Sequence, residues 1–153
     1  MSERVQLVVF LIDGQRYALP LTSVTHIVSA AAVTPLPNAP AMVFGALNLH
    51  GNVIAVLDVR QRFQLPQREI GLTDQFLIAQ TQGRSVALVV DEAQGLVERE
   101  ASDVINAHLI TPGLDPFQGV LKLDDGLVLI HDLEKFLSLD QARLLDLALE
   151  QVE

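Results

Sequence analysis

The sequence repeats itself, and this repeat restricts the possible folds more than any other feature of its 153 residues. The segment FLIDGQRYALPLTSVTHIV at 10–28 reappears in diverged form as FLIAQTQGRSVALVVDEAQGLV at 76–97, with an offset of 69 residues from Gly14 and Gly83 onward. A second match has an offset of 74 residues and relates Gly45, Leu47, Leu49, Asp58 and Val59 to Gly119, Leu121, Leu123, Asp132 and Leu133. Two copies of one unit predict two similar subdomains.

The repeated units are short apolar runs rich in Val, Ile and Leu, which are typical of buried strands. Each run ends at Gly, Asn, Asp or Pro, where turns are favoured. These patterns predict an all-β protein with strands near 5–12, 16–21, 24–29, 43–49, 53–57, 74–80, 85–90, 95–98, 117–123 and 127–131.

Four short segments between these runs carry residues that tolerate the backbone of a tight hairpin turn. They are Asp13-Gly14, His50-Gly51-Asn52, Gln82-Gly83 and Asp124-Asp125-Gly126. The proline-rich segment 34–40 lies between two hairpins and is predicted to be a fixed loop outside the sheet ladder. Its counterpart in the second half, 103–116, is predicted to be a longer connection.

Small sheets that close on themselves leave no exposed edge, so we expect two barrel-like halves of about five strands each. The first barrel is predicted at roughly 14–73 and the second at roughly 74–137, within one domain that covers residues 1–153. Ser138 and Gln141 form a capping box ahead of an amphipathic helix at 138–152. Its apolar stripe, which is expected to pack on a barrel, contains Ala142, Leu145, Leu149 and Val152.

Composition excludes several classes of function. The formal net charge of −9 disfavours binding to nucleic acid or to anionic lipid. Half of the residues are hydrophobic, which argues against disorder, yet the apolar runs are all too short to span a bilayer. The absence of cysteine and of a signal peptide pattern is compatible with a soluble cytoplasmic protein that does not insert into a membrane.

No familiar arrangement of catalytic or metal-binding residues occurs in the chain. The chain has four histidines: His26, His50, His108 and His131. Their spacings are none of those at which two histidines usually bind one metal ion. The sequence also lacks a GxSxG nucleophile elbow, a GxxxxGK[ST] phosphate loop and a GxGxxG dinucleotide fingerprint. We therefore expect no catalytic residues, no metal site and no cofactor. An enzyme or a barrel that binds a small ligand stays open as an alternative.

The stretch GALNLHGNVIAVLDVR at 45–60 places polar residues at both ends of a buried strand. Asn48 and His50 lie in the turn before it, and Asp58 and Arg60 follow it. Because Asp58 and Arg60 are two residues apart, they can pair on one strand face. Alternatively, Asp58 caps a following helical turn whose end Arg60 covers, and the two interpretations are compatible.

At this stretch the chain resembles the CheW-like family of coupling proteins, whose pattern reads approximately GxxNxRGxxxPxxDLR. Four further segments resemble the family in order and spacing: FLIDGQRYALPLTSVTHI, LPNAP, VALVVDEA and GLVLIHDLEKFL. The resemblance covers essentially the whole chain. It implies two intertwined SH3-like barrels of five strands each.

The resemblance also implies a function. Members are non-catalytic adaptors that couple chemoreceptors to a CheA-type histidine kinase in bacterial chemotaxis. They hold the cytoplasmic tip of the receptor in a groove between the barrels, and they bind the regulatory domain of the kinase through other surfaces. The receptor-facing pattern falls on Asn48, His50, Gly51, Asp58 and Arg60, and a second segment implicated in coupling falls on Val24, His26 and Ile27. On burial grounds alone, Val24 and Ile27 are expected in the core and His26 in solvent.

Three positions depart from the family pattern. His50 replaces the usual arginine, His26 replaces the usual acid, and Ala55 replaces the proline. An imidazole cannot form the two-pronged contact of a guanidinium with a carboxylate at neutral pH. The departures suggest a diverged paralogue, so the alternative is an array organiser, for example in twitching motility or polar localisation, that binds kinase or another CheW-like domain but not the receptor.

Overall fold

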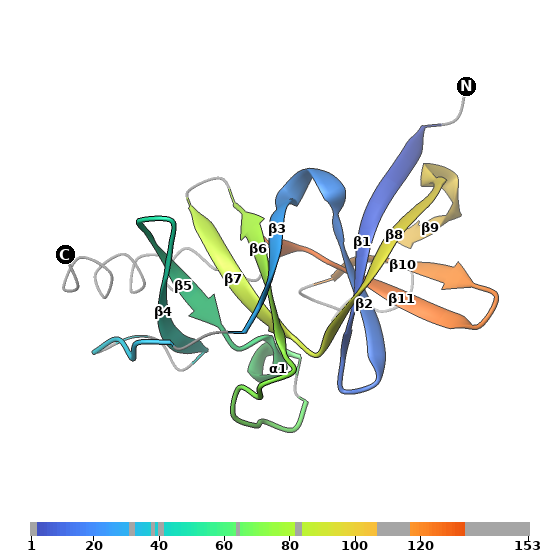
Figure 1. Ribbon diagram of the computed structural model, residues 1–153. Helices are drawn as coiled ribbons and strands as arrows, with labels where there is room; N and C mark the ends of the chain where they lie inside the picture. The colour runs from blue at the N-terminus through green and yellow to red at the C-terminus, as the bar shows by residue number, and fades with distance from the viewer. Residues whose placement is uncertain are drawn as a thin grey trace.

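The computed structural model describes residues 3–30, 33–37, 39, 42–63, 65–81, 84–106 and 117–133. Within these ranges the chain is built from strands, joined by one short helix and two 3-10 turns (Figure 1). The elements are β1 (Arg4–Ile12), β2 (Gln15–Pro20), η1 (Leu21–Ser23), β3 (Val24–Ser29), β4 (Val43–Leu49), β5 (Asn52–Leu57), α1 (Val59–Arg62), β6 (Gln75–Gln80), β7 (Ser85–Val90), β8 (Glu92–Glu100), η2 (Ala101–Asp103), β9 (Val104–Asn106), β10 (Phe117–Leu123) and β11 (Gly126–His131).

The predicted all-β class is confirmed, and every predicted strand is present. The predicted strand at 95–98 is longer, because β8 runs from Glu92 to Glu100. The two segments predicted to be loops, 34–40 and 103–116, each contribute residues that pair with a neighbouring strand. Thr34 exchanges two backbone hydrogen bonds with Ala46 of β4, and β9 pairs with β10. The rest of the 103–116 connection and the predicted helix at 138–152 lie outside the described residues.

Positive φ angles mark the predicted hairpin turns. Asp13 and Gly14 have φ of 53° and 78°, and His50 and Gly51 have φ of 52° and 86°. Gly126, which ends the fourth predicted turn, has φ of 144°. The turn at 82–83 lies outside the described residues, but the antiparallel pairing of β6 with β7 is the one predicted for it.

The strands form two sheets that repeat the same order. The six-stranded sheet has the order β8-β1-β2-β11-β10-β9, and the five-stranded sheet has the order β3-β6-β7-β5-β4. The sequence repeat relates β1, β2 and β3 to β6, β7 and β8, and it relates β4 and β5 to β10 and β11. Each strand therefore occupies the same place as its copy, including the parallel pairs β2–β11 and β5–β7.

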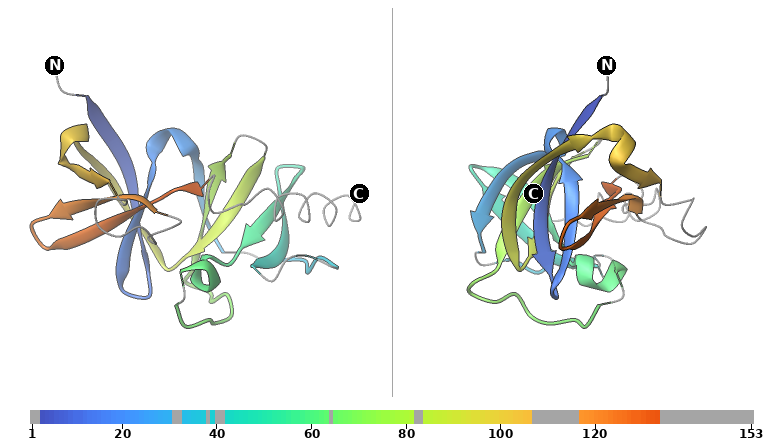
Figure 2. Two further views of the ribbon diagram at one scale, coloured as in Figure 1. Left: turned by 180° about the vertical axis from the view of Figure 1, so that it is seen from behind. Right: turned by 90° about the vertical axis from the view of Figure 1, so that its right-hand side faces the viewer.

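The two halves exchange their first hairpins. The β1–β2 hairpin lies in the sheet that otherwise contains strands of the second half, and the β6–β7 hairpin lies in the sheet with β3, β4 and β5 (Figure 2). The sheets thus do not coincide with the ranges 14–73 and 74–137. The physical reason is that the short connections β2–β3 and β7–β8 each carry the chain from one sheet to the other.

In the part of the chain that the structure describes, three apolar clusters stabilise this arrangement. One cluster lies within each sheet, and a third, here called the shared core, takes residues from both. β1 shows how one strand serves two clusters, because successive side chains point to opposite faces. Leu7 and Val9 lie in the cluster of the six-stranded sheet, while Val8, Phe10 and Ile12 lie in the shared core.

Gly45 is expected to be the glycine least tolerant of substitution in the first half. A Cβ atom there would lie 2.2 Å from the Thr34 carbonyl oxygen, and φ at this position is 154°. We expect Gly45→Ala to lower the free energy of unfolding by about 1–3 kcal/mol, because the bridging backbone must move. Urea unfolding measures the change. Gly14→Ala is the matched control, since Gly14 also has a positive φ but open space around it, and an equal loss in both variants would contradict the steric explanation.

Candidate functional site

The first group of predicted site residues forms the exposed turn between β4 and β5. Asn48, His50 and Gly51 are all exposed to solvent. The Gly51 N–H donates a hydrogen bond of 3.0 Å to Asn48 Oδ1, which fixes the turn that His50 enters with positive φ. The turn therefore presents the His50 imidazole to solvent from a fixed backbone.

The second group lies at the opposite end of β5 and is buried. Asp58 is 7% exposed and Arg60 is 8% exposed. Asp58 Oδ1 accepts a hydrogen bond of 3.1 Å from the Arg60 N–H, as expected of a residue that caps the start of α1. Val59 lies in the shared core and Phe63 packs against it. Tyr17 stacks on Phe63 with ring centroids 4.6 Å apart.

The guanidinium of Arg60 binds Asp91, which lies in the VALVVDEA segment but was not predicted as a site residue. Its Nη2 donates to both carboxylate oxygens of Asp91, at 2.8 and 3.0 Å, and its Nη1 donates to the Pro66 carbonyl oxygen at 3.0 Å. The Asp13 N–H donates to Asp91 Oδ2 at 2.8 Å. One carboxylate thus joins the β1–β2 turn, α1 and the start of β8.

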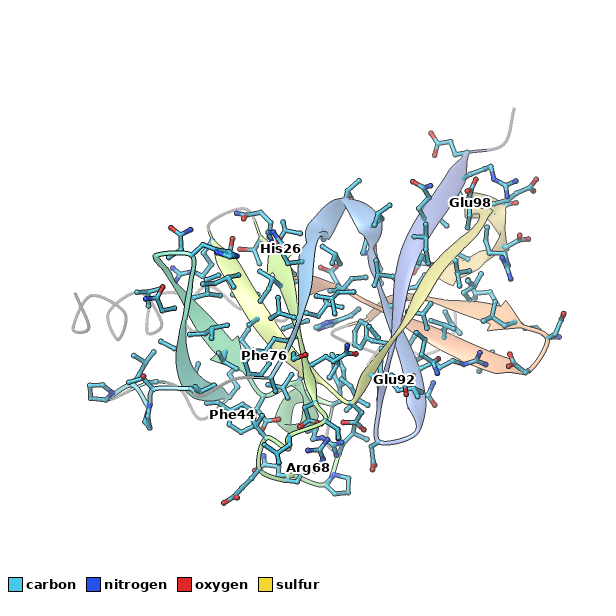
Figure 3. The ribbon with its side chains drawn as sticks, in the orientation of Figure 1. His26, Phe44, Arg68, Phe76, Glu92 and Glu98 are labelled. Atoms are coloured by element: carbon cyan, nitrogen blue, oxygen red, sulfur yellow. The ribbon has the colours of Figure 1, made fainter. Side chains whose placement is uncertain are left out.

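Arg68 extends this network across the 65–74 loop (Figure 3). It donates two hydrogen bonds to Asp74, at 2.6 and 2.7 Å, and one to Asp91 at 2.6 Å. The hydrogen bonds from Arg68 hold the pKa of Asp74 below its usual value, against the opposing effect of burial. Burial would by itself raise the pKa of Asp91, but the Asp13 N–H and the Arg60 and Arg68 guanidiniums lower it overall. Both acids are therefore anionic at neutral pH.

The third group lies on β3, an edge strand of the five-stranded sheet. Val24 is partly buried against the shared core, whereas His26 is exposed and Ile27 is 43% exposed. Ile27 was expected in the core, and this prediction is wrong. The pairing of β3 with β6 shifts register between Val24 and His26, and the strand continues along the sheet edge, where no further strand among the described residues covers it.

Leu96 is the counterpart of Ile27 in the second half, and it is 55% exposed on the edge strand β8. Ile27 pairs with Leu77 and Leu96 pairs with Val8, and both partners lie in the shared core. Cross-strand partners project from the same face of a sheet. Ile27 and Leu96 therefore project from the core-facing side of two edge strands, and these two exposed positions are here called the margin of the shared core. The 69-residue offset could have identified Leu96 from the sequence.

The predicted site residues do not form one cluster. The turn at 48–51 and the buried pair Asp58 and Arg60 lie at opposite ends of β5, and β3 lies at the other edge of the sheet. Among the described residues, no three His, Cys, Asp or Glu side chains are placed to share a metal ion. In the same part of the chain, no helix has the length and apolar character needed to cross a membrane.

Comparison with known proteins shows what this architecture corresponds to. Residues 6–141 match the model of the CheW-like domain. The chain belongs to the CheW-like family. The chemotaxis protein CheW of Bacillus subtilis is 30% identical over 102 residues, which cover 67% of this chain and 65% of that protein. The chemotaxis protein CheW of Treponema pallidum is 24% identical over 143 residues, which cover 90% of this chain and 84% of that protein.

The fold is also that of a solved CheW-like structure. The scaffolding protein TtCheW from Thermoanaerobacter tengcongensis superposes with a TM-score of 0.75 at 23% identity, over 84% of this chain and 89% of that chain. The similarity confirms the predicted β-rich fold, with its two sheets. The relatives named here are chemotaxis proteins, and the solved structure is that of a scaffolding protein.

Proposed function

We propose that the chain is a non-catalytic adaptor that couples the cytoplasmic tips of chemoreceptors to the regulatory domain of a CheA-type histidine kinase, in the cytoplasm at receptor arrays. The observation that carries the proposal is the pair Ile27 and Leu96, which leaves the margin of the shared core apolar and exposed on two edge strands. A helical receptor tip has apolar side chains that can cover such a margin.

The three groups of site residues take different parts in this proposal. Ile27 and Leu96 contact the receptor tip directly. His26 pairs with Ile78, which lies in the cluster within the five-stranded sheet, so His26 projects from the opposite face of β3 and contributes a polar contact at the strand edge. The turn of Asn48, His50 and Gly51 contributes a polar contact at the edge of an interface, where charged and polar groups affect specificity more than affinity. Asp58 and Arg60 are too buried for direct contact, so they act by holding α1 and the adjoining strands in place.

Substitution of Asn48 tests the turn. Asn48→Ala removes the acceptor of the Gly51 N–H, and we expect it to weaken tip binding about fivefold, since one hydrogen bond contributes about 1 kcal/mol. Calorimetric titration with the receptor tip encoded in the same genome gives the affinities. Asn48→Asp, which keeps the acceptor, is the control. If Asn48→Ala binds the tip with unchanged affinity, the turn is not part of the interface.

A second candidate function is favoured by one observation, the imidazole of His50 in place of the family's arginine. In this alternative the chain organises an array by binding the kinase or another CheW-like domain, and it does not contact a receptor. Saturable binding to the kinase regulatory domain with no binding to any receptor tip of the same genome would select this alternative.

A further inference from the structure

The exposed pair Ile27 and Leu96 belongs to two different sheets, so its spacing depends on how the sheets are joined. Ile27 lies on β3, which pairs with β6, and Leu96 lies on β8, which pairs with β1. The spacing across the margin is therefore set by whatever fixes β6 against β8.

The chain link from β7 to β8 and the shared core hold these strands together, and among the described residues one side-chain hydrogen bond joins β6 to β8 directly. Gln75, the first residue of β6, accepts a hydrogen bond of 2.6 Å from the Ala93 N–H of β8 through its Oε1. Gln75 is two residues from Leu77, the partner of Ile27, and Ala93 is three residues from Leu96. Gln75 is half-buried, so the hydrogen bond is partly protected from competition by water.

The local backbone explains why a side chain is used here. The pairing of β1 with β8 shifts register between Val9 and Phe10, and Gly95 on the facing strand has φ of 115°. Such an irregularity interrupts the ladder and turns the strand. The side-chain amide of Gln75 binds the Ala93 N–H immediately before this irregularity. The hydrogen bond therefore fixes the direction in which the rest of β8 continues.

We propose that Gln75 is a positioning residue that sets the spacing of the edge strands β3 and β8, and with it the separation of Ile27 and Leu96 that a partner must span. The inference rests on the proposed function only for the identity of that partner. Gln75 itself makes no contact with the receptor tip in this proposal.

Distance measurement between spin labels tests the positioning role without any partner. The chain has no cysteine, so Ile27→Cys and Leu96→Cys can be labelled specifically. With Gln75 present we expect one narrow distance distribution. Gln75→Met removes the acceptor at similar size and should broaden or shift the distribution, whereas Gln75→Glu keeps an acceptor oxygen and should restore it. Gln80→Met is the matched control, because the Gln80 amide contacts the Thr81 carbonyl oxygen and the Ser85 hydroxyl within the five-stranded sheet and does not reach β8.

Titration of unlabelled variants then links spacing to binding. We expect Gln75→Met to weaken receptor tip binding roughly three- to tenfold, the range for one lost hydrogen bond, and to leave kinase domain binding unchanged. An unchanged distance distribution in Gln75→Met would overturn the inference, as would equal losses toward both partners. If the unmodified protein does not bind the tip, the proposed function fails, while the distances still decide the role of Gln75.

Discussion

Replacing Asp91 by alanine is expected to lower the free energy of unfolding by about 2–4 kcal/mol, among the largest effects of any single substitution outside the apolar core. The substitution leaves Arg60, whose side chain is 10% exposed, without its main anionic partner, and it also deprives Arg68 and the Asp13 N–H of an acceptor. A buried charge without its partner costs more than the pair contributes. The value lies below that for a fully buried pair because the Asp91 side chain is 30% exposed.

Urea unfolding of three variants tests this explanation. Asp91→Ala and Arg60→Met should each destabilise the protein, and the double variant should be less destabilised than the sum of the two, because the groups act as one unit. Asp125→Ala is the control, since Asp125 pairs with Arg16 in an exposed position and its loss should leave stability unchanged. Additive losses at Asp91 and Arg60 would contradict the shared network.

The same network predicts how stability depends on pH. The pKa values of Asp74 and Asp91 are lowered in the folded protein relative to an ordinary aspartate of about 3.9, so the unfolded chain binds protons first as pH falls. Their contribution is therefore present above about pH 4 and is lost as pH falls through the lower folded values. Thermal unfolding between pH 3 and pH 7 should show a smaller acid dependence in Asp91→Ala than in the unmodified protein.

Placing a carboxylate at the margin of the shared core should abolish most receptor binding. We expect Ile27→Asp and Leu96→Asp each to weaken affinity for the receptor tip by about 30-fold or more, which corresponds to the roughly 2 kcal/mol of a hot-spot residue. Both side chains are already exposed, at 43% and 55%, so the folded state should tolerate the change. Calorimetric titration measures the affinities.

Two other exposed apolar residues provide matched controls. Ile105 and Leu127 are 44% and 52% exposed, and they lie on β9 and β11, away from the edge strands β3 and β8 and from the turn at 48–51. Ile105→Asp and Leu127→Asp should leave tip binding unchanged. If all four aspartate variants weaken the interaction equally, the effect is one of added negative charge, and the margin is not the binding surface.

Much of the fold could be predicted because strand alternation and turn residues are local signals. The offsets of 69 and 74 residues also carried information on tertiary structure, since they relate strands that occupy equivalent places in the two sheets. Local patterns alone do not predict the exchange of the β1–β2 and β6–β7 hairpins. The exchange depends on the direction in which short connections leave each sheet, which the residue types at 21–23 and 91 do not specify.

The site was predicted less completely, for a physical reason. Arg60 appears in the sequence as a charged residue near a surface motif, yet its aliphatic stem and guanidinium are enclosed because Asp91, 31 positions later, lies beside it. A contact between residues so far apart in the sequence cannot be predicted from local residue spacing. Ile27 was assigned to the core from how often its residue type is buried, which does not distinguish an edge strand from a central one.

A bridging experiment tests the proposed coupling most directly. The receptor tip is immobilised, and the kinase regulatory domain is passed over it with and without this protein. We expect the kinase domain to be retained only when the protein is present, in an amount that saturates with the protein, and we expect Ile27→Asp to abolish retention while kinase binding in solution persists. If the kinase domain and the receptor tip cannot be bound at the same time, the protein does not couple them.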